Sequence, residues 1–204
     1  YVCCNEITVC NGLNEIILRL FKIQKPSLFI RGWVFCFLSY KLFMWKVKKS
    51  KVHGSGVFAN KDIKKNTKII EYIGEKVLKS EGDKRSAKRI KDFLHSEETG
   101  SVYIFELNSK YDIDGFFEYN KARYINHSCN PNCEVDIVDG KIWISSIKKI
   151  YKGQELSYDY GYEFDKEDYK DHICKCGDKK CIGYIISSDD WKKFSKHISK
   201  ITKR

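Results

Sequence analysis

The residues best suited to chemistry lie in three short segments of the sequence. Residues 123–133 (RYINHSCNPNC) combine an Asn-His pair with two cysteines, and hydrophobic patterning does not account for this composition. Residues 155–162 (ELSYDYGY) place three tyrosines within five positions, and residues 174–181 (CKCGDKKC) place three cysteines within eight. We expect the three segments to converge on one active site.

The cysteine segment indicates a metal site. Cys174, Cys176 and Cys181 can supply three thiolates. A tetrahedral zinc site requires four ligands, so the fourth must come from another part of the chain. A bound metal would also stabilise a tail that is too short to have its own core. The alternative is three unrelated free cysteines.

Two polar segments have the composition of a ligand site. Asn126 carries two donors and an acceptor, which suit the amino and carboxylate groups of a bound amino acid. His127 could act as a general base or metal ligand, but no second histidine lies at ligand spacing. The glycines at residues 53–56 (HGSG) allow positive φ angles and a close approach to a ligand. The alternatives are a buried polar turn and an ordinary hairpin turn.

The elements that must position these residues are mostly strands. Residues 101–107 alternate, which places Tyr103, Phe105 and Leu107 on one face. Asp139-Gly140 is typical of a hairpin turn. Helical spacing of apolar residues predicts a surface helix over 80–94, and a capping sequence at 187–190 (SSDD) precedes an amphipathic helix. Further strands are expected over residues 53–59, 68–72, 141–147 and 154–160.

Composition limits the class of protein. The 204 residues, 42% of them hydrophobic, suit one domain with an extension. The nine cysteines and the absence of a visible secretory leader favour a reducing compartment over a disulfide scaffold. Arg31 and Lys41 interrupt the apolar residues 28–43, so no membrane span is expected. The net charge of +11 indicates either anionic partners such as nucleic acid or a solvated lysine-rich surface.

Six motifs in a fixed order identify a family resemblance. Residues 53–59 (HGSGVFA), 71–75 (EYIGE) and 101–107 (SVYIFEL) precede the three segments described first, and IGYI follows the last cysteine. Over about residues 45–184 the chain resembles SET-domain protein lysine methyltransferases with a post-SET zinc module. The resemblance implies a mostly β, β-clip-like, pseudoknotted SET domain with a few short helices and a zinc-bound tail. We expect an N-terminal extension (1–43), a SET domain (44–165), a post-SET module (166–187) and a basic C-terminal helix (188–204).

The resemblance also implies residue roles. It assigns S-adenosyl-L-methionine binding to His53, Gly54, Ser55, Gly56, Tyr103, Asn126, His127 and Lys175. It makes Tyr160 the catalytic tyrosine, places Tyr103 across the methyl-transfer channel, and gives Tyr158 the position that sets the number of methyl groups added. Cys129 is the implied fourth zinc ligand beside Cys174, Cys176 and Cys181, and Cys133 is the alternative.

The implied reaction needs no nucleophilic side chain. A substrate lysine must arrive neutral although its ordinary pKa is about 10.4, and a dry channel beside the cofactor's sulfonium disfavours its ammonium form. Tyrosine hydroxyls and carbonyl oxygens can then orient the amine. A tyrosine at position 158 favours monomethylation.

The expected partner is a lysine-bearing protein or peptide, basic or chromatin-associated, which the acidic residues 163–171 could attract. Nucleic acid is an open alternative partner, and no membrane is expected. The compartment would be cytoplasmic in a bacterium and nuclear in a eukaryote. The rival interpretations are a SET-like module that binds without turnover and a nucleic-acid-binding protein.

Overall fold

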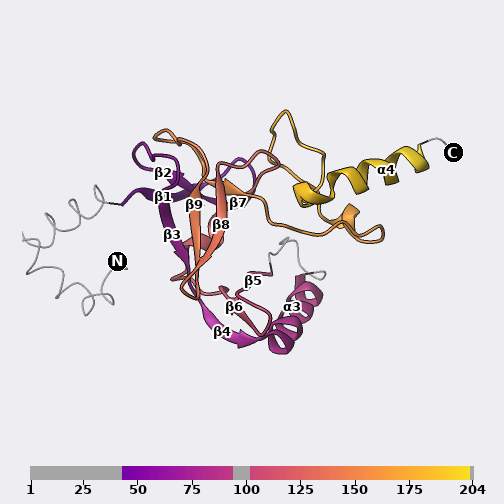
Figure 1. The fold of residues 1–204 in the computed structure, drawn as a ribbon, viewed down its shortest axis with the longest axis horizontal. Coiled ribbons are helices and arrows are strands. Elements are labelled where there is room, and N and C mark those ends of the chain that lie inside the picture. The colour runs from indigo at the N-terminus through magenta and orange to yellow at the C-terminus, as the bar shows by residue number, and fades with distance from the viewer. Residues whose placement is uncertain (1–42, 94–101, 203–204) are drawn as a thin grey trace, which may run out of the picture. The chain divides into compact units, whose positions relative to one another are not determined.

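A computed structural model describes residues 43–93 and 102–202, and Met44–Arg204 form one compact unit by their contacts (Figure 1). Short strands dominate this unit, together with two α-helices and three 3-10 turns among the described residues. The expectation of a mostly β fold with a few short helices is confirmed. The predicted extension over residues 1–43 lies almost entirely outside the described residues. No described helix combines the length and apolar character that crossing a membrane requires.

The strands form four small sheets. In the first sheet β1 (Trp45–Lys49) pairs with β2 (Ser55–Ala59). In the second sheet β9 (Lys141–Ser146) lies between β3 (Lys68–Tyr72) and β8 (Cys133–Val138). In the third sheet β6 (Tyr111–Asp114) lies between β4 (Glu75–Leu78) and β5 (Ile104–Glu106). These pairings are antiparallel, whereas β7 (Asn126–His127) and β10 (Ser157–Tyr158) pair in parallel.

Local sequence signals account for several of these elements. β3 has the predicted bounds, and its residues Ile69, Ile70 and Tyr72 enter the main hydrophobic core. The β8–β9 hairpin turns at Asp139 and Gly140, whose φ angles of 53° and 70° fit the predicted two-residue turn. The core also takes side chains from β2, β9 and the 3-10 turn η1 (Lys121–Tyr124).

Two predicted strands are shorter in the structure. Of the predicted strand over 101–107, the described residues 102–107 form a strand only at β5, because Tyr103 has a left-handed φ of 58° that interrupts the expected alternation. Residues 154–160 form a strand only at β10, with a single bridge between Glu155 and Phe58 before it. Both departures from extended backbone lie beside residues with predicted roles in the site.

Helix α3 (Lys79–Phe93) forms where a surface helix was predicted, and charged contacts hold it. Ala87 and Ile90, which gave the helical spacing, are exposed. Instead, Arg85 and Arg89 donate to the buried carboxylate of Asp114 on β6 at 2.8–2.9 Å. The helix therefore lies against the third sheet through ion pairs that amphipathic periodicity cannot reveal.

The C-terminal region has a small core of its own. Helix α4 (Trp191–Ile201) packs Phe194 against Phe164, Tyr169 and Ile186. The 3-10 turns η2 (Tyr169–Asp171) and η3 (Ser188–Asp190) flank this cluster in sequence. Ser187, expected to cap the final helix, caps η3 instead by accepting from the amide of Asp189.

Candidate active site and metal centre

The first two chemistry-bearing segments lie side by side. Parallel pairing sets Asn126 opposite Ser157 and His127 opposite Tyr158. Beyond the strands, the Ser128 backbone amide donates to the Tyr158 carbonyl at 3.1 Å, and the Asn132 side-chain amide donates to the Glu155 carbonyl at 2.7 Å. Residues 126–132 and 155–158 are thus joined along their length by backbone and side-chain hydrogen bonds.

Three tyrosines, one buried and two half-buried, form a row after this crossing. The Tyr160 hydroxyl donates to the Ile125 carbonyl at 3.1 Å. The Tyr160 ring centroid lies 5.1 Å from that of Tyr158 and 5.9 Å from that of Tyr162. Burial raises the pKa of all three phenols. All three therefore remain protonated, neutral hydrogen-bonding groups at ordinary pH.

Tyr103 reaches the same cluster from another sheet. Its carbonyl accepts hydrogen bonds from the Tyr72 hydroxyl at 3.0 Å and the Gly115 amide at 2.8 Å. The Arg123 guanidinium lies 4.3 Å from its ring centroid. Tyr103 is also close enough to influence the pKa of Tyr160 electrostatically. Several contacts therefore hold Tyr103 in its left-handed conformation beside the tyrosine row.

Tyr72 and Phe105 complete the aromatic cluster, and sequence reasoning assigned neither a role. Their rings are 4.5 Å apart, and Phe105 lies 5.7 Å from Tyr158. Burial raises the pKa of Tyr72 far above its usual value. Their place in the site could have been inferred from the family motifs, because Tyr72 lies in EYIGE and Phe105 lies in SVYIFEL.

Asn126 connects the strand crossing to the glycine-bearing segment. Its side-chain NH2 donates to the Ser55 carbonyl at 3.1 Å, the His53 carbonyl at 3.4 Å and a Glu155 carboxylate oxygen at 2.7 Å. Because all three partners are acceptors, they fix the orientation of the amide. The donor side of the Asn126 amide is thus used within the protein.

Glu155 is a site residue that sequence reasoning missed. Its carboxylate accepts hydrogen bonds from Asn126 and from the Ser50 hydroxyl, the latter at 2.8 Å and 3.0 Å. A Cβ added to the buried Gly56 would lie only 2.3 Å from this carboxylate. Gly56 is therefore required for close packing. Gly54 has a φ of 45° with open space around it, and His53, Gly54 and Ser55 are exposed.

His127 connects the tyrosine row to the cysteines. Its Nδ1 accepts from the Tyr160 amide at 3.2 Å, so in the neutral ring Nε2 carries the proton. Nε2 lies 3.5 Å from the Cys129 sulfur and can donate to it. Burial lowers the pKa of His127, with Asp159 opposing this in part, which favours the neutral ring. Both nitrogens are engaged inside the protein, an arrangement unlike that of a general base facing a substrate.

Four cysteines come together with the geometry of a metal site. The sulfur atoms of Cys129, Cys174, Cys176 and Cys181 all lie within 4.8 Å of one another. Cys129 is 3.8 Å from both Cys174 and Cys181. Ligands about 2.3 Å from a tetrahedral zinc ion are separated by about 3.8 Å. The donor set and spacing therefore fit a tetrahedral metal ion.

Two other predicted residues lie outside this group. The Cys133 sulfur, the alternative fourth ligand, contacts the Asn132 side-chain oxygen, and Cys133 belongs to the main core. Burial raises its pKa to about 12, so it stays a thiol. Lys175, a predicted cofactor contact, is exposed between two of the clustered cysteines.

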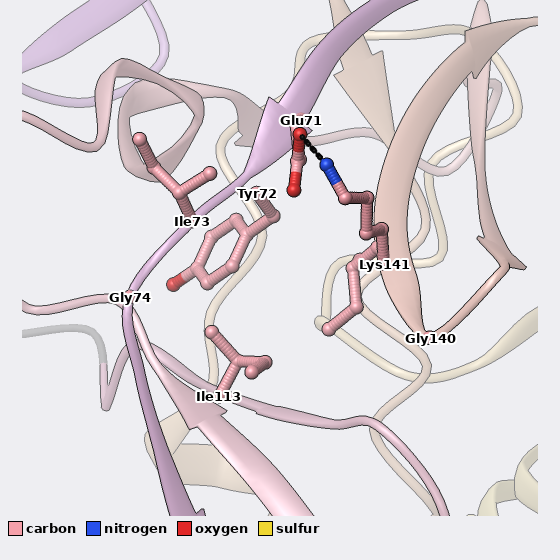
Figure 2. A pocket seen from close by; sticks show the side chains of 8 residues that line it. Glu71, Tyr72, Ile73, Gly74, Ile113, Gly140 and Lys141 are labelled. Atoms are coloured by element: carbon pink, nitrogen blue, oxygen red, sulfur yellow. Dashed lines mark hydrogen bonds and ion pairs between the residues drawn. The ribbon is translucent and has the colours of Figure 1, made fainter.

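A pocket separate from the proposed site is lined in part by Tyr72. It is lined by the end of β3, by Ile113 and by the β8–β9 hairpin, and Glu71 and Lys141 form an ion pair of 3.4 Å at its edge (Figure 2). Asn126 and Tyr160 are not among its lining residues. It meets the aromatic cluster only through Tyr72.

Fold and site together define a β-rich domain with a buried tyrosine cluster and a four-cysteine group that links its tail to its centre. Comparison with known families identifies this class. The SET-domain model matches residues 54–161, and the chain belongs to the SET-domain family. The resemblance inferred from the motifs is thereby confirmed.

Its relatives include large eukaryotic enzymes. The chain is 41% identical over 137 residues to histone-lysine N-methyltransferase trr of Drosophila melanogaster, and the matched region is 65% of this chain and 5% of that protein. It is 37% identical over 145 residues to human histone-lysine N-methyltransferase 2D, and this match covers 67% of the chain and 2% of the human protein. It is 38% identical over 143 residues to the H3 lysine-4 specific histone-lysine N-methyltransferase of Aspergillus oryzae, and this match covers 67% of the chain and 11% of the fungal protein. The chain therefore spans a small fraction of these relatives.

Proposed function

We propose that this chain is an S-adenosyl-L-methionine-dependent protein-lysine N-methyltransferase. The observation that carries the proposal is the position of Tyr160, whose hydroxyl meets the Ile125 carbonyl directly before the Asn126 amide. One short segment therefore adjoins both the predicted catalytic tyrosine and the predicted cofactor loop. Membership in the SET-domain family and relatives that are histone-lysine methyltransferases support the same reaction.

The cofactor would be held by residues 53–56, Asn126 and the backbone of His127. The open Gly54 leaves room for a ligand against the main chain, and the side-chain oxygen of Asn126 is an acceptor that suits an ammonium group. When bound, S-adenosyl-L-methionine supplies the methyl group and a positive charge. Tyr103 and the exposed Lys175 are further proposed contacts.

The protein's part in the reaction is to receive and orient a neutral lysine amine. Tyr103, Tyr158 and Tyr160 provide an aromatic environment with little water, which lowers the pKa of an entering lysine. Because burial raises the pKa of Tyr158 and Tyr160, these two phenols stay neutral and can hydrogen-bond to the amine. The gain in rate would come from orientation and fixed dipoles.

Tyr158 is proposed to limit the product to monomethyl-lysine. Its side chain is 5% exposed and is packed between the rings of Phe105 and Tyr160. Such packing leaves little freedom for its hydroxyl to move away from an amine that carries a second methyl group. The hydroxyl therefore occupies the room that further methylation would need.

The cysteine group is proposed to hold zinc and to attach the tail to the site. Cys129, Cys174, Cys176 and Cys181 would be the four thiolate ligands. The proposed substrate is a histone or another basic protein, and a histone substrate would place the enzyme in a nucleus.

Replacement of Tyr160 tests the proposal. The variant Tyr160→Phe removes one hydroxyl, and we expect turnover to fall by about 100-fold or more while cofactor binding is retained. Tyr162→Phe, the same change in the neighbouring ring, is the matched control and should keep most activity. The assay follows transfer of labelled methyl groups to recombinant histones and to proteins of a cell extract. Full activity of Tyr160→Phe would refute the mechanism, and a protein that binds cofactor but methylates nothing would favour a binding module.

A further inference from the structure

Helix α4 presents a ridge of lysines on the side opposite its packed face. Phe194, Trp191 and Ile198 belong to the C-terminal core. At 100° per residue, Lys192 and Lys196 lie opposite Phe194, with Lys200 beside them on the next turn. All three lysines are exposed, and their Cα atoms are spaced by about 6 Å along the helix axis.

The charges of this ridge are not neutralised by the described residues. α4 contains no acidic residue. Lys193, on the flank, pairs with Asp190 and donates to the Phe164 carbonyl, whereas Lys192, Lys196 and Lys200 form no ion pair within residues 43–93 and 102–202. Phe164 and Tyr169, which belong to the acidic residues 163–171, contact the packed face of α4, and the Lys193 amine donates to the Phe164 carbonyl, so this segment follows the packed face and the Lys193 flank.

Helix α3 offers an instructive comparison. It also carries exposed lysines at helical spacing, namely Lys84, Lys88 and Lys91. However, Glu81, Asp83 and Asp92 are interspersed on the same helix, and its arginines are engaged with Asp114, Glu75 and Glu81. The three lysines of α4 therefore lack the acidic neighbours on the same helix that those of α3 have.

The chemistry of the partner follows from the two faces of α4. A basic amphipathic helix that binds a membrane or a helix-binding protein must offer its apolar face. In α4 most of this face is already used, because Phe194 is 7% exposed and the Trp191 indole donates to the Ile186 carbonyl at 3.1 Å, whereas Ile201 in the last turn stays 49% exposed. A partner recognised by the lysines alone must be a polyanion with regularly spaced charges, such as a phosphate backbone.

We propose that Lys192, Lys196 and Lys200 form a binding surface for the phosphate backbone of double-stranded DNA. The proposal is independent of the methyltransferase activity, since none of the three lysines belongs to the site described above. Binding would be non-specific in sequence, because lysines on a convex ridge contact phosphates without reading bases.

The test measures binding of the full chain to a fluorescent 20-base-pair duplex at several salt concentrations. Three phosphate contacts contribute about −2.7 to the slope of log affinity against log salt, or about 40-fold in affinity between 50 and 200 mM salt. We expect the triple variant Lys192→Gln, Lys196→Gln, Lys200→Gln to lose this contribution. The matched triple variant Lys84→Gln, Lys88→Gln, Lys91→Gln removes the same charge from α3 and should keep the slope within one unit.

Each outcome decides the proposal. An equal loss of slope in both triple variants would mean diffuse attraction by net charge. A slope unchanged by the α4 variant would mean that another surface binds DNA. Either result overturns the proposal, as does absence of binding at 50 mM salt. Thermal unfolding checks that the α4 variant is folded, and because its substituted side chains are exposed, its melting temperature should match that of the α3 variant closely. Methyl transfer to a short peptide is measured separately, so failure there leaves the DNA result interpretable.

Discussion

Gly56→Ala is expected to weaken cofactor binding by displacing Glu155. The added Cβ would lie 2.3 Å from the carboxylate oxygen and 2.9 Å from its carbon. The carboxylate is the end of a flexible side chain, so it would move away while the backbone of β2 stays in place. Its hydrogen bond with Asn126, 2.7 Å long in the structure, would then be lost.

The magnitude follows from the nature of this bond. A hydrogen bond to a charged group contributes about 1.5–3 kcal/mol. Without it the Asn126 amide can rotate away from the orientation that directs its oxygen to a ligand. If about half of this energy is needed to restore the orientation on binding, affinity for S-adenosyl-L-methionine falls on the order of tenfold. Titration calorimetry measures the loss directly.

A double-mutant cycle separates this cause from general strain. In the Glu155→Ala background the carboxylate is already absent, so Gly56→Ala should add little further loss. Ser50→Ala is the control that removes only the other partner of Glu155, and it should leave cofactor affinity close to that of the parent. Losses that add fully in the double variant would show that Gly56 acts independently of Glu155, and the reasoning would fail.

Three further changes test other parts of the structure. Cys129→Ala should abolish stoichiometric zinc binding, whereas Cys133→Ala should retain one zinc per chain with only a core-packing cost of about 1–2 kcal/mol; metal analysis after dialysis distinguishes them. Tyr158→Phe should increase di- and trimethyl-lysine in product mass spectra, and abundant trimethylation by the unaltered protein would contradict the role given to Tyr158. Asp114→Asn should lower the free energy of unfolding by about 1.5–3 kcal/mol, because it removes the charge of a buried carboxylate that accepts from two part-exposed arginines. Glu75→Gln, which meets Arg85 at the surface, should change denaturation curves little, and equal effects would refute the distinction.

The sequence predicted those parts of the fold that depend on local patterns. β3 and the Asp139-Gly140 turn follow from strand residues and from a dipeptide suited to positive φ. The convergence of Cys129 with the three later cysteines followed from family order, since 45 residues separate it from Cys174 and no local periodicity could join them. The four-cysteine group was therefore predicted from spacing in part and from resemblance for the rest.

Contacts between distant charged groups were not predictable in this way. The pairing of Arg89 with Asp114 joins residues 25 apart, and the pairing of Asn126 with Glu155 joins residues 29 apart. Both depend on which strands become neighbours, and periodicity within one element carries no information about that. The left-handed conformation of Tyr103 has the same origin, because its carbonyl is held by Tyr72 and Gly115 from other segments.

The dense chemistry of residues 126–129 follows from their central place in the crossing. Successive residues of a strand face opposite sides, so Asn126 can hold the glycine-bearing segment while His127 accepts from the Tyr160 amide. Two residues later, Cys129 joins the four-cysteine group and meets the other nitrogen of His127. The imidazole thus lies between this group and the backbone of the proposed catalytic tyrosine. Through these two contacts His127 links the C-terminal tail to the proposed active site.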